Sequence, residues 1–181
     1  MADINFSARV PRSADAPEEA PGGSEPIWDV IELLFFAYRD FVGDPDHVLE
    51  RFGFGRAHHR VLHFVNRNPG MKVADLLDIL KITKQSLGRV LKQLIDQGYV
   101  VQKAGPNDRR QRLLYVTPKG ETLALKLAGL QTERIAAALA GLGPGADETA
   151  RRFLAAMINP EDRDEVLRLI ARGNRLHRAR P

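Results

Sequence analysis

The sequence predicts a mainly α-helical fold with one small antiparallel β-hairpin, arranged as a winged helix-turn-helix with further helices at both ends. Three observations support this prediction. Residues 73–80 and 83–97 form two helical patterns separated by a tight turn. Residues 99–103 and 112–117, which follow directly, are rich in the β-branched and aromatic residues of strands. Long apolar helical patterns precede and follow this unit, which we place at residues 54–120.

The central element is the helix over residues 83–97, which Gly98 ends. Thr83 suits the N-cap position. Apolar residues at spacings of 3, 4 and 7 predict one buried stripe, made of Leu87, Val90, Leu91 and Leu94. The opposite face, at about 100° per residue, carries polar residues, namely Gln85, Arg89, Lys92 and Asp96, with Ser86 and Gln93 at its edge.

This polar face is typical of a helix that reads a DNA major groove. Gln85 can make two hydrogen bonds to adenine and Arg89 two to guanine, whereas Lys84 and Lys92 suit phosphates. The alternative is that some of these side chains only solvate the helix. From this face we predict six DNA-binding residues, namely Thr83, Lys84, Gln85, Ser86, Arg89 and Lys92.

The charge of the chain is distributed unevenly. Residues 1–55 hold 4 Lys and Arg against 11 Asp and Glu, whereas residues 56–120 hold 13 against 4. Positive charge is therefore concentrated in the segment predicted to contact DNA, where release of counterions from phosphates favours binding. The alternative is a solvated basic face without a partner.

A wide apolar helical pattern precedes the winged helix. Pro26 suits a first helical position, and apolar residues recur at helical spacing over residues 27–42. We expect this helix to end at residues 43–45, with residues 46–51 as one further turn. Its apolar face is wider than one small domain needs, so a second chain could bury the excess. We assign residues 26–53 as an N-terminal dimerisation helix.

Two helical regions follow the winged helix. Thr117 and Pro118 start a helix that reaches about residue 140, and a second region covers residues 146–171. Asn159-Pro160 interrupts the second region, where we expect a kink or two shorter helices. We assign residues 121–171 as C-terminal dimerisation helices and residues 172–181 as a frayed basic tail. Residues 1–25 lack helical or strand periodicity, which predicts a disordered acidic leader.

Several function classes are disfavoured. The chain has no cysteine, Ser86 lacks a G-x-S-x-G setting, and no glycine-rich phosphate loop follows a strand. We therefore predict a protein that is not an enzyme and that carries no cofactor. The most apolar run, residues 27–42, is interrupted by charges and is too short to span a bilayer, and no signal peptide is present. We expect a soluble cytoplasmic protein without a membrane partner.

Three histidines occur close together, at His58, His59 and His63. His59 and His63 are spaced i, i+4, which is compatible with metal chelation, but carboxylates that could complete a site occur only in other segments. We therefore predict no metal site. The alternatives are histidines that pack or cap a helix, or a ligand pocket.

Residues 108–120 resemble the wing of the MarR family of bacterial transcription regulators. That family has D-x-R, then apolar residues, then T-x-x-G, and this chain has Asp108, Arg110, Thr117 and Gly120 at these positions. The order of the elements also fits, and the resemblance covers about residues 27–170. Residues 55–62 and 82–86 further resemble the PetP-like regulators of alphaproteobacteria.

The resemblance implies a sequence-specific transcription regulator that binds double-stranded DNA as a symmetric homodimer. Its two recognition helices would enter successive major grooves of a pseudo-palindromic operator. It also implies that Arg110 reaches into the adjacent minor groove and that Asp108 braces the wing. On physical grounds alone, Arg109 is an equally good candidate for backbone contact.

The resemblance further implies a small aromatic or anionic effector, bound between the dimer helices and the winged helix. The candidate lining residues are Trp28, Phe35, Arg39, His59 and His63, with Arg39 available to a ligand carboxylate. Trp28 and Phe35 could instead be plain dimer core. Two other interpretations stay open, which are a module that docks an acidic protein partner and a DNA binder without an effector.

Overall fold

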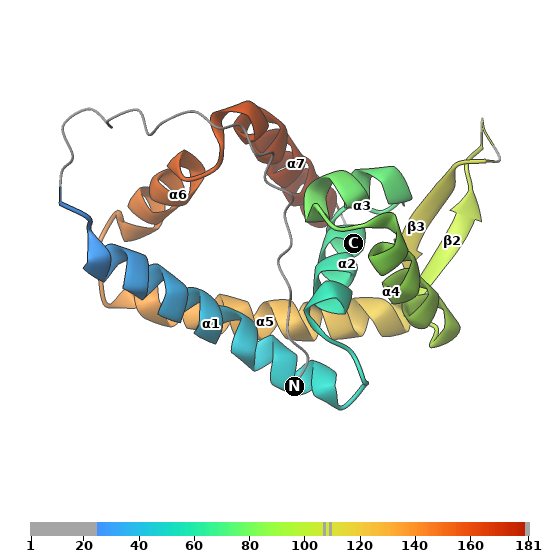
Figure 1. Cartoon of the computed structure of the whole chain (residues 1–181), viewed down its shortest axis with the longest axis horizontal. Helices are drawn as coiled ribbons and strands as arrows, with labels where there is room; N and C mark the ends of the chain where they lie inside the picture. The colour runs from blue at the N-terminus through green and yellow to red at the C-terminus, as the bar shows by residue number, and fades with distance from the viewer. Residues whose placement is uncertain (1–24, 107, 109, 180–181) are drawn as a thin grey trace, which may run out of the picture.

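The computed structural model describes residues 25–179 except residues 107 and 109. The predicted acidic leader lies almost wholly outside the described residues, and so does Arg109. Two long helices, α1 (Trp28–Glu50) and α5 (Pro118–Ala140), pack along each other, and the winged helix lies at one end of this pair (Figure 1). Helices α6 (Ala146–Ala156) and α7 (Pro160–Arg178) lead back from the far end of α5 to α2 (Arg56–Arg67).

The winged helix contains a three-stranded antiparallel sheet in the order β1-β3-β2. The predicted hairpin is confirmed as β2 (Val100–Ala104) and β3 (Arg112–Val116), with Val100 opposite Val116 and Ala104 opposite Arg112. The two-residue strand β1 (Met71–Lys72) pairs with Leu114 and Leu113 on the other side of β3. Strand β1 was not predicted, because two residues are too few to show an alternating pattern.

The predicted helix pair is confirmed as α3 (Val73–Leu80) and α4 (Lys84–Asp96). Between them, Lys81 adopts the left-handed conformation (φ 49°) and ends α3. The predicted stripe of α4 is buried, and it joins a core shared by α2, α3, α5 and the sheet. The fully buried leucines of this core include Leu62, Leu76, Leu87, Leu94, Leu114 and Leu127.

The start of α5 is attached to the end of α4 through residues 117–120. The Thr117 hydroxyl donates to the Gly98 carbonyl oxygen (2.7 Å) and accepts from the Gly120 amide (3.1 Å). Lys119 donates to the Gln97 carbonyl oxygen (2.9 Å), where a cation is favourable at a helix C-terminus. Helix α4 is therefore held at its C-terminal end by the same residues that start the long helix α5.

The predicted end of the first helix at residues 43–45 is wrong, because α1 continues through Pro45 to Glu50. A proline within a helix cannot donate to the carbonyl four residues earlier, here that of Phe41. The side-chain amide of Gln131 on α5 donates weakly to this carbonyl oxygen at 3.5 Å. Packing against α5 thus compensates in part for the missing hydrogen bond.

The predicted interruption at Asn159-Pro160 is confirmed, since α6 ends before it and α7 starts with Pro160. Arg163 donates to the carbonyl oxygens of Ala156 and Ile158, both at 2.9 Å, which satisfies acceptors at the end of α6. The predicted frayed tail after Ala171 is wrong, because α7 continues to Arg178. Basic residues in its last turn favour the helical conformation there.

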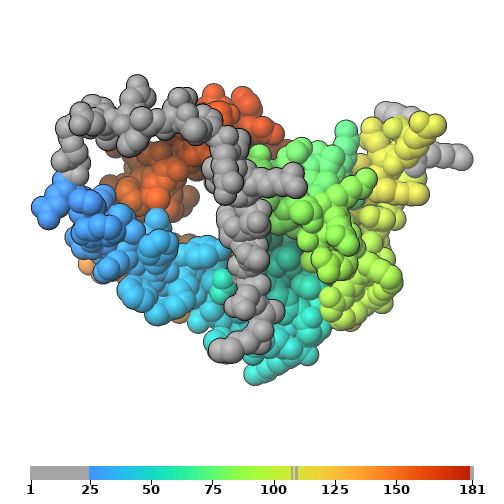
Figure 2. All heavy atoms as spheres, in the orientation of Figure 1, coloured from blue at the N-terminus to red at the C-terminus, as the bar shows by residue number. Residues whose placement is uncertain are grey.

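Many apolar side chains on the long helices are exposed. Trp28 is 63% and Phe35 69% exposed. Further exposed apolar residues are Phe153 and Leu154 on α6, Met157 directly after it and Ile170 on α7. Figure 2 shows an open space between α1 and the α6–α7 segment. Among the described residues, none of the helices combines the length and apolar character that a membrane crossing requires.

Candidate nucleic-acid interface and ligand pocket

The first turn of α4 is stabilised by Thr83, as predicted. Its hydroxyl oxygen accepts from the Ser86 amide (3.1 Å) and the hydroxyl donates to Ser86 Oγ (2.9 Å). Ser86 is half-buried, whereas the other predicted DNA-binding residues of this helix are exposed on one face, namely Lys84, Gln85, Arg89 and Lys92. The N-cap and the buried leucines hold this polar face in a defined orientation.

Two residues of the predicted outward face have partners within the chain. Lys92 pairs with Asp96 one turn later on the exposed surface. An exposed pair of this kind stabilises a helix by less than about 1 kcal/mol, so Lys92 remains free to exchange Asp96 for a phosphate. Gln93, predicted at the edge of the face, is half-buried instead and bonds to His58 and to the Gly53 carbonyl oxygen.

The wing between β2 and β3 is organised by Asp108. Its carboxylate accepts from the Arg110 amide (2.9 Å), and its carbonyl oxygen accepts from the Gln111 amide (3.0 Å). The Gly105 amide donates to the Gln111 carbonyl oxygen and closes the turn. Arg110 and Arg112 are exposed, and predicted Arg109 lies outside the described residues.

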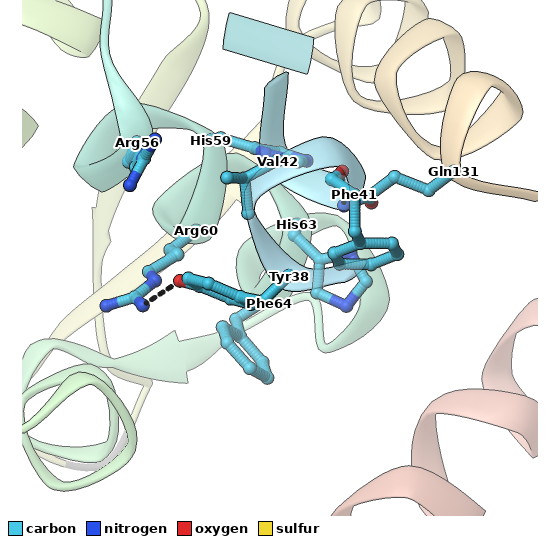
Figure 3. A pocket seen from close by; sticks show the side chains of 9 residues that line it. All are labelled: Tyr38, Phe41, Val42, Arg56, His59, Arg60, His63, Phe64 and Gln131. Carbon is cyan, nitrogen blue, oxygen red and sulfur yellow. Dashed lines mark hydrogen bonds between the residues drawn. The ribbon is translucent and has the colours of Figure 1, made fainter. Parts of the chain in front are cut away.

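A cavity of about 200 Å³ lies where α1, α2 and α5 meet (Figure 3). Its apolar wall includes Phe41, Val42 and Phe64. The polar lining comes mainly from one face of α2, as residues three and four apart in a helix share a face. The polar and aromatic lining residues are Tyr38, Arg56, His59, Arg60, His63 and Gln131.

Only two of the five predicted pocket residues line this cavity, His59 and His63. Trp28 and Phe35 lie on the exposed part of α1. Arg39 is also exposed, bonded to Asp40 (2.7 Å) and placed 4.9 Å from the centre of the Phe36 ring. The side chains of α1 that reach the cavity are Tyr38, Phe41 and Val42, because these face α2 and α5.

The cationic residues of the cavity, Arg56 and Arg60, were not among the predicted pocket residues. The spacing of 3, 4 and 7 from Arg56 to His59, Arg60 and His63 was a signal that could have revealed them. Arg56 bonds to the Asp46 carboxylate (2.7 Å), and Arg60 donates to the Tyr38 hydroxyl (3.2 Å). Figure 3 shows this second bond crossing from α2 to α1.

The histidines of the cavity are held neutral near pH 7. Burial lowers the pKa of His63 to about 4, helped by the neighbouring His59 and by the positive charge of Arg67. Burial also lowers the pKa of His59, partly opposed by Asp46. Among the described residues, no three His, Asp or Glu side chains gather as a set of metal ligands. The cavity therefore combines aromatic walls, neutral imidazoles and guanidinium groups, which suits an aromatic anion.

Residues 52–111 match the model of the MarR family, and this match spans the helix pair and β2 and ends directly before β3. The HTH-type transcriptional regulator PetP of Rhodobacter capsulatus is 45% identical over 148 residues, which cover 78% of this chain and 89% of the relative. The chain belongs to the MarR family of transcriptional regulators. The same relative confirms the resemblance to the PetP-like subgroup.

Solved structures support the fold of this MarR-family regulator. FabT of Streptococcus pneumoniae, solved in complex with DNA, is similar with a TM-score of 0.65 and 16% identity over 73% of this chain and 94% of that one. A MarR family protein of Mycobacterium tuberculosis, solved with p-aminosalicylic acid, has a TM-score of 0.53 and 21% identity over 75% of this chain and 100% of that one. At these identities the likeness confirms the winged-helix fold alone.

Proposed function

We propose that this MarR-family regulator binds a pseudo-palindromic operator as a homodimer and that a small aromatic anion modulates the binding. The proposal rests on the exposed polar face of α4, which lies opposite the buried apolar stripe of the same helix. Gln85 and Arg89 are the candidates for base edges, since each can make two hydrogen bonds to a purine in the major groove. Lys84 and Lys92 are the candidates for phosphates.

The wing supplies the second proposed contact with DNA. Asp108 fixes the backbone at Arg110, so the exposed guanidinium of Arg110 projects from a constrained turn. A narrow A·T-rich minor groove has an enhanced negative potential that attracts such a side chain. Arg109 is the adjacent candidate for the same groove or its phosphates. The surplus of positive charge in residues 56–120 favours both contacts.

The exposed apolar residues of α1, α6 and α7 support the homodimer. A monomer rarely leaves such an extended set of large apolar side chains in water. A second copy placed against α1 and α7 would cover them and would present two α4 helices to one side of a duplex. Twofold symmetry of the protein then matches twofold symmetry of the operator.

The cavity at α1, α2 and α5 is the proposed effector site. It lies between the helices of the proposed dimer interface and α2 of the winged helix. Arg60 can pair with a carboxylate there, and Arg56 can do so in exchange for Asp46. The p-aminosalicylic acid bound to the related-fold protein is a small aromatic anion of this class. Binding would shift the population between DNA-competent and incompetent spacings of the two α4 helices.

The test is a gel-shift and footprinting experiment on the DNA upstream of the gene for this protein. We expect sequence-selective binding by a dimer. The footprint should show DNA protected over two half-sites about one helical turn apart. With six to ten phosphate contacts, affinity should fall by about 10³–10⁵ between 50 and 200 mM salt. Binding that random competitor DNA removes completely would contradict the proposal and favour an acidic protein partner.

A further inference from the structure

We infer that His58 and Gln93 form the joint through which α2, the helix that lines the cavity, sets the orientation of the recognition helix α4. This inference rests on the proposed function of α4 and goes beyond it, because it names how a change at the cavity reaches the DNA-binding face.

Helix α2 contacts different structures on its two sides. One face presents Arg56, His59, Arg60 and His63 to the cavity. His58 lies about 100° around the helix from His59 and bonds to α4 instead.

At the other end of α2, Arg67 donates to the Asn174 side-chain oxygen of α7 (2.5 Å). A β-carbon at Gly173 would lie only 3.0 Å from this guanidinium. Helix α2 therefore lines the cavity and is hydrogen-bonded to both α7 and α4.

The hydrogen bonds around His58 form a directed chain. The Gly55 amide donates to His58 Nδ1 (3.1 Å), so the ring proton lies on Nε2. Nε2 donates to Gln93 Oε1 (2.9 Å), and Gln93 Nε2 donates to the Gly53 carbonyl oxygen (3.1 Å). Each donor meets an acceptor only when His58 is neutral with its proton on Nε2. Burial lowers the pKa of His58, which agrees with a neutral ring.

The imidazole of His58 is also held in its plane. The Phe54 ring stacks on it with centroids 4.7 Å apart and planes 11° apart. Phe54 is buried and meets Tyr99 edge-on at 5.1 Å. Because the ring can neither rotate nor exchange its partners freely, a displacement of the α2 backbone at His58 is passed to Gln93.

The position of Gln93 on α4 makes small displacements matter. Gln93 lies eight residues from Gln85, which is about 12 Å along the helix. A tilt of about 5° about the Gln93 contact would move the first turn of α4 by about 1 Å. Hydrogen bonds to base edges tolerate only a few tenths of an ångström. A modest movement of α2 can therefore decide whether the N-terminal half of α4 reaches the bases.

The experiment measures operator affinity for the full-length chain in a double-mutant cycle that needs no effector. Tyr38→Phe removes the bond between Arg60 and α1 and changes the cavity side of α2, while Gln93→Leu cuts the joint at nearly constant volume. We expect Gln93→Leu to weaken operator binding about tenfold, the effect of losing one or two net hydrogen bonds. We expect Tyr38→Phe to change affinity in the native background and to have no effect beside Gln93→Leu.

The controls separate coupling from general loss of structure. Gln97→Leu changes the same residue type at an exposed position on the end of α4 and should leave both affinity and the Tyr38→Phe response unchanged. His58→Phe keeps the ring that stacks on Phe54, loses the hydrogen bonds and should not add to the effect of Gln93→Leu. Should Gln93→Leu fail to fold, Gln93→Glu keeps an acceptor for Nε2 and should retain the Tyr38→Phe response.

Three results would overturn the joint. They are additive effects of His58→Phe and Gln93→Leu, a Tyr38→Phe response that persists beside Gln93→Leu, and no Tyr38→Phe response in the native background. All three presuppose a native chain that binds its operator selectively. A native chain that binds DNA without selectivity would refute the proposed function itself, so the two failures are distinguishable.

Discussion

Gly120 lies against Tyr99 so closely that a β-carbon at position 120 would stand 2.0 Å from the Tyr99 carbonyl oxygen. This contact joins the first turn of α5 to the residue directly before β2, shortly after the end of α4. It gives a physical reason for the glycine of the T-x-x-G motif, because no other residue leaves room for the Tyr99 backbone.

Gly120→Ala should therefore destabilise the protein strongly. The clash is with backbone, which cannot move without displacing β2 or α5, so we expect a loss of about 3 kcal/mol or more in the free energy of unfolding. Urea denaturation measures it. Gly129→Ala is the matched control, since it lies in the same helix with no atom within 4 Å of the added carbon. It should be neutral or stabilising by up to about 1 kcal/mol, and equal losses in both variants would contradict the steric explanation.

Arg89→Ala should weaken binding to the cognate operator much more than binding to random DNA. A two-bond contact to guanine contributes about 1–3 kcal/mol of discrimination, whereas a phosphate contact contributes to all sequences equally. Fluorescence anisotropy with both DNAs at one salt concentration measures the difference. Equal weakening would reassign Arg89 to the phosphate backbone.

Stability should fall as the pH drops from about 6.5 to about 4. In this range the unfolded chain protonates His63 at its ordinary pKa, whereas the folded chain does not until its lowered pKa of about 4 is reached. The unfolded state thus binds more protons, and lowering the pH favours it. Between pH 7.5 and 5 the loss from His63 is up to about 2 kcal/mol.

His63→Gln should flatten this pH dependence. Urea denaturation at fixed protein concentration, at pH 7.5 and pH 5, compares the variant with the native chain. His59 and His58, whose pKa values burial also lowers, account for the slope that remains. His177→Gln, at an exposed position near the end of α7, is the matched control for the substitution itself. A His63→Gln chain with the full native slope would refute the assignment.

Phe35→Glu should dissociate the proposed dimer. The side chain is 69% exposed in one protomer, so a charge there costs the isolated chain little, but burying it unpaired in an interface costs several kcal/mol. Analytical ultracentrifugation should show a monomer that retains its helical circular dichroism and binds the operator at least tenfold more weakly. Val101→Glu, on exposed β2, is the control that should stay dimeric. A Phe35→Glu dimer would place the interface elsewhere.

Sequence alone determined the elements whose signals are local. The leucine stripe of α4, the N-cap at Thr83 and the strand composition around Leu114 each depend on a few neighbouring residues, so periodicity and capping rules located them. The same holds for the break at Asn159-Pro160. The polar face of α4 could also be predicted, because helical geometry alone decides which residues lie opposite the buried stripe.

Tertiary structure decided the features that depend on partners distant in the chain. Strand β1 exists because Met71 and Lys72 meet β3. Helix α1 passes Pro45 while it packs against α5, where Gln131 compensates in part for the missing hydrogen bond. Gln93 turns inward to His58, thirty-five residues away.

The cavity shows the same limit. Its lining depends on which side of α1 meets α2 and α5, so Tyr38 belongs to it and Phe35 does not. Periodicity identifies the apolar width of a helix but not which part of that width a neighbour covers. Contacts between distant segments make that choice, because burial of each side chain depends on the whole packed arrangement.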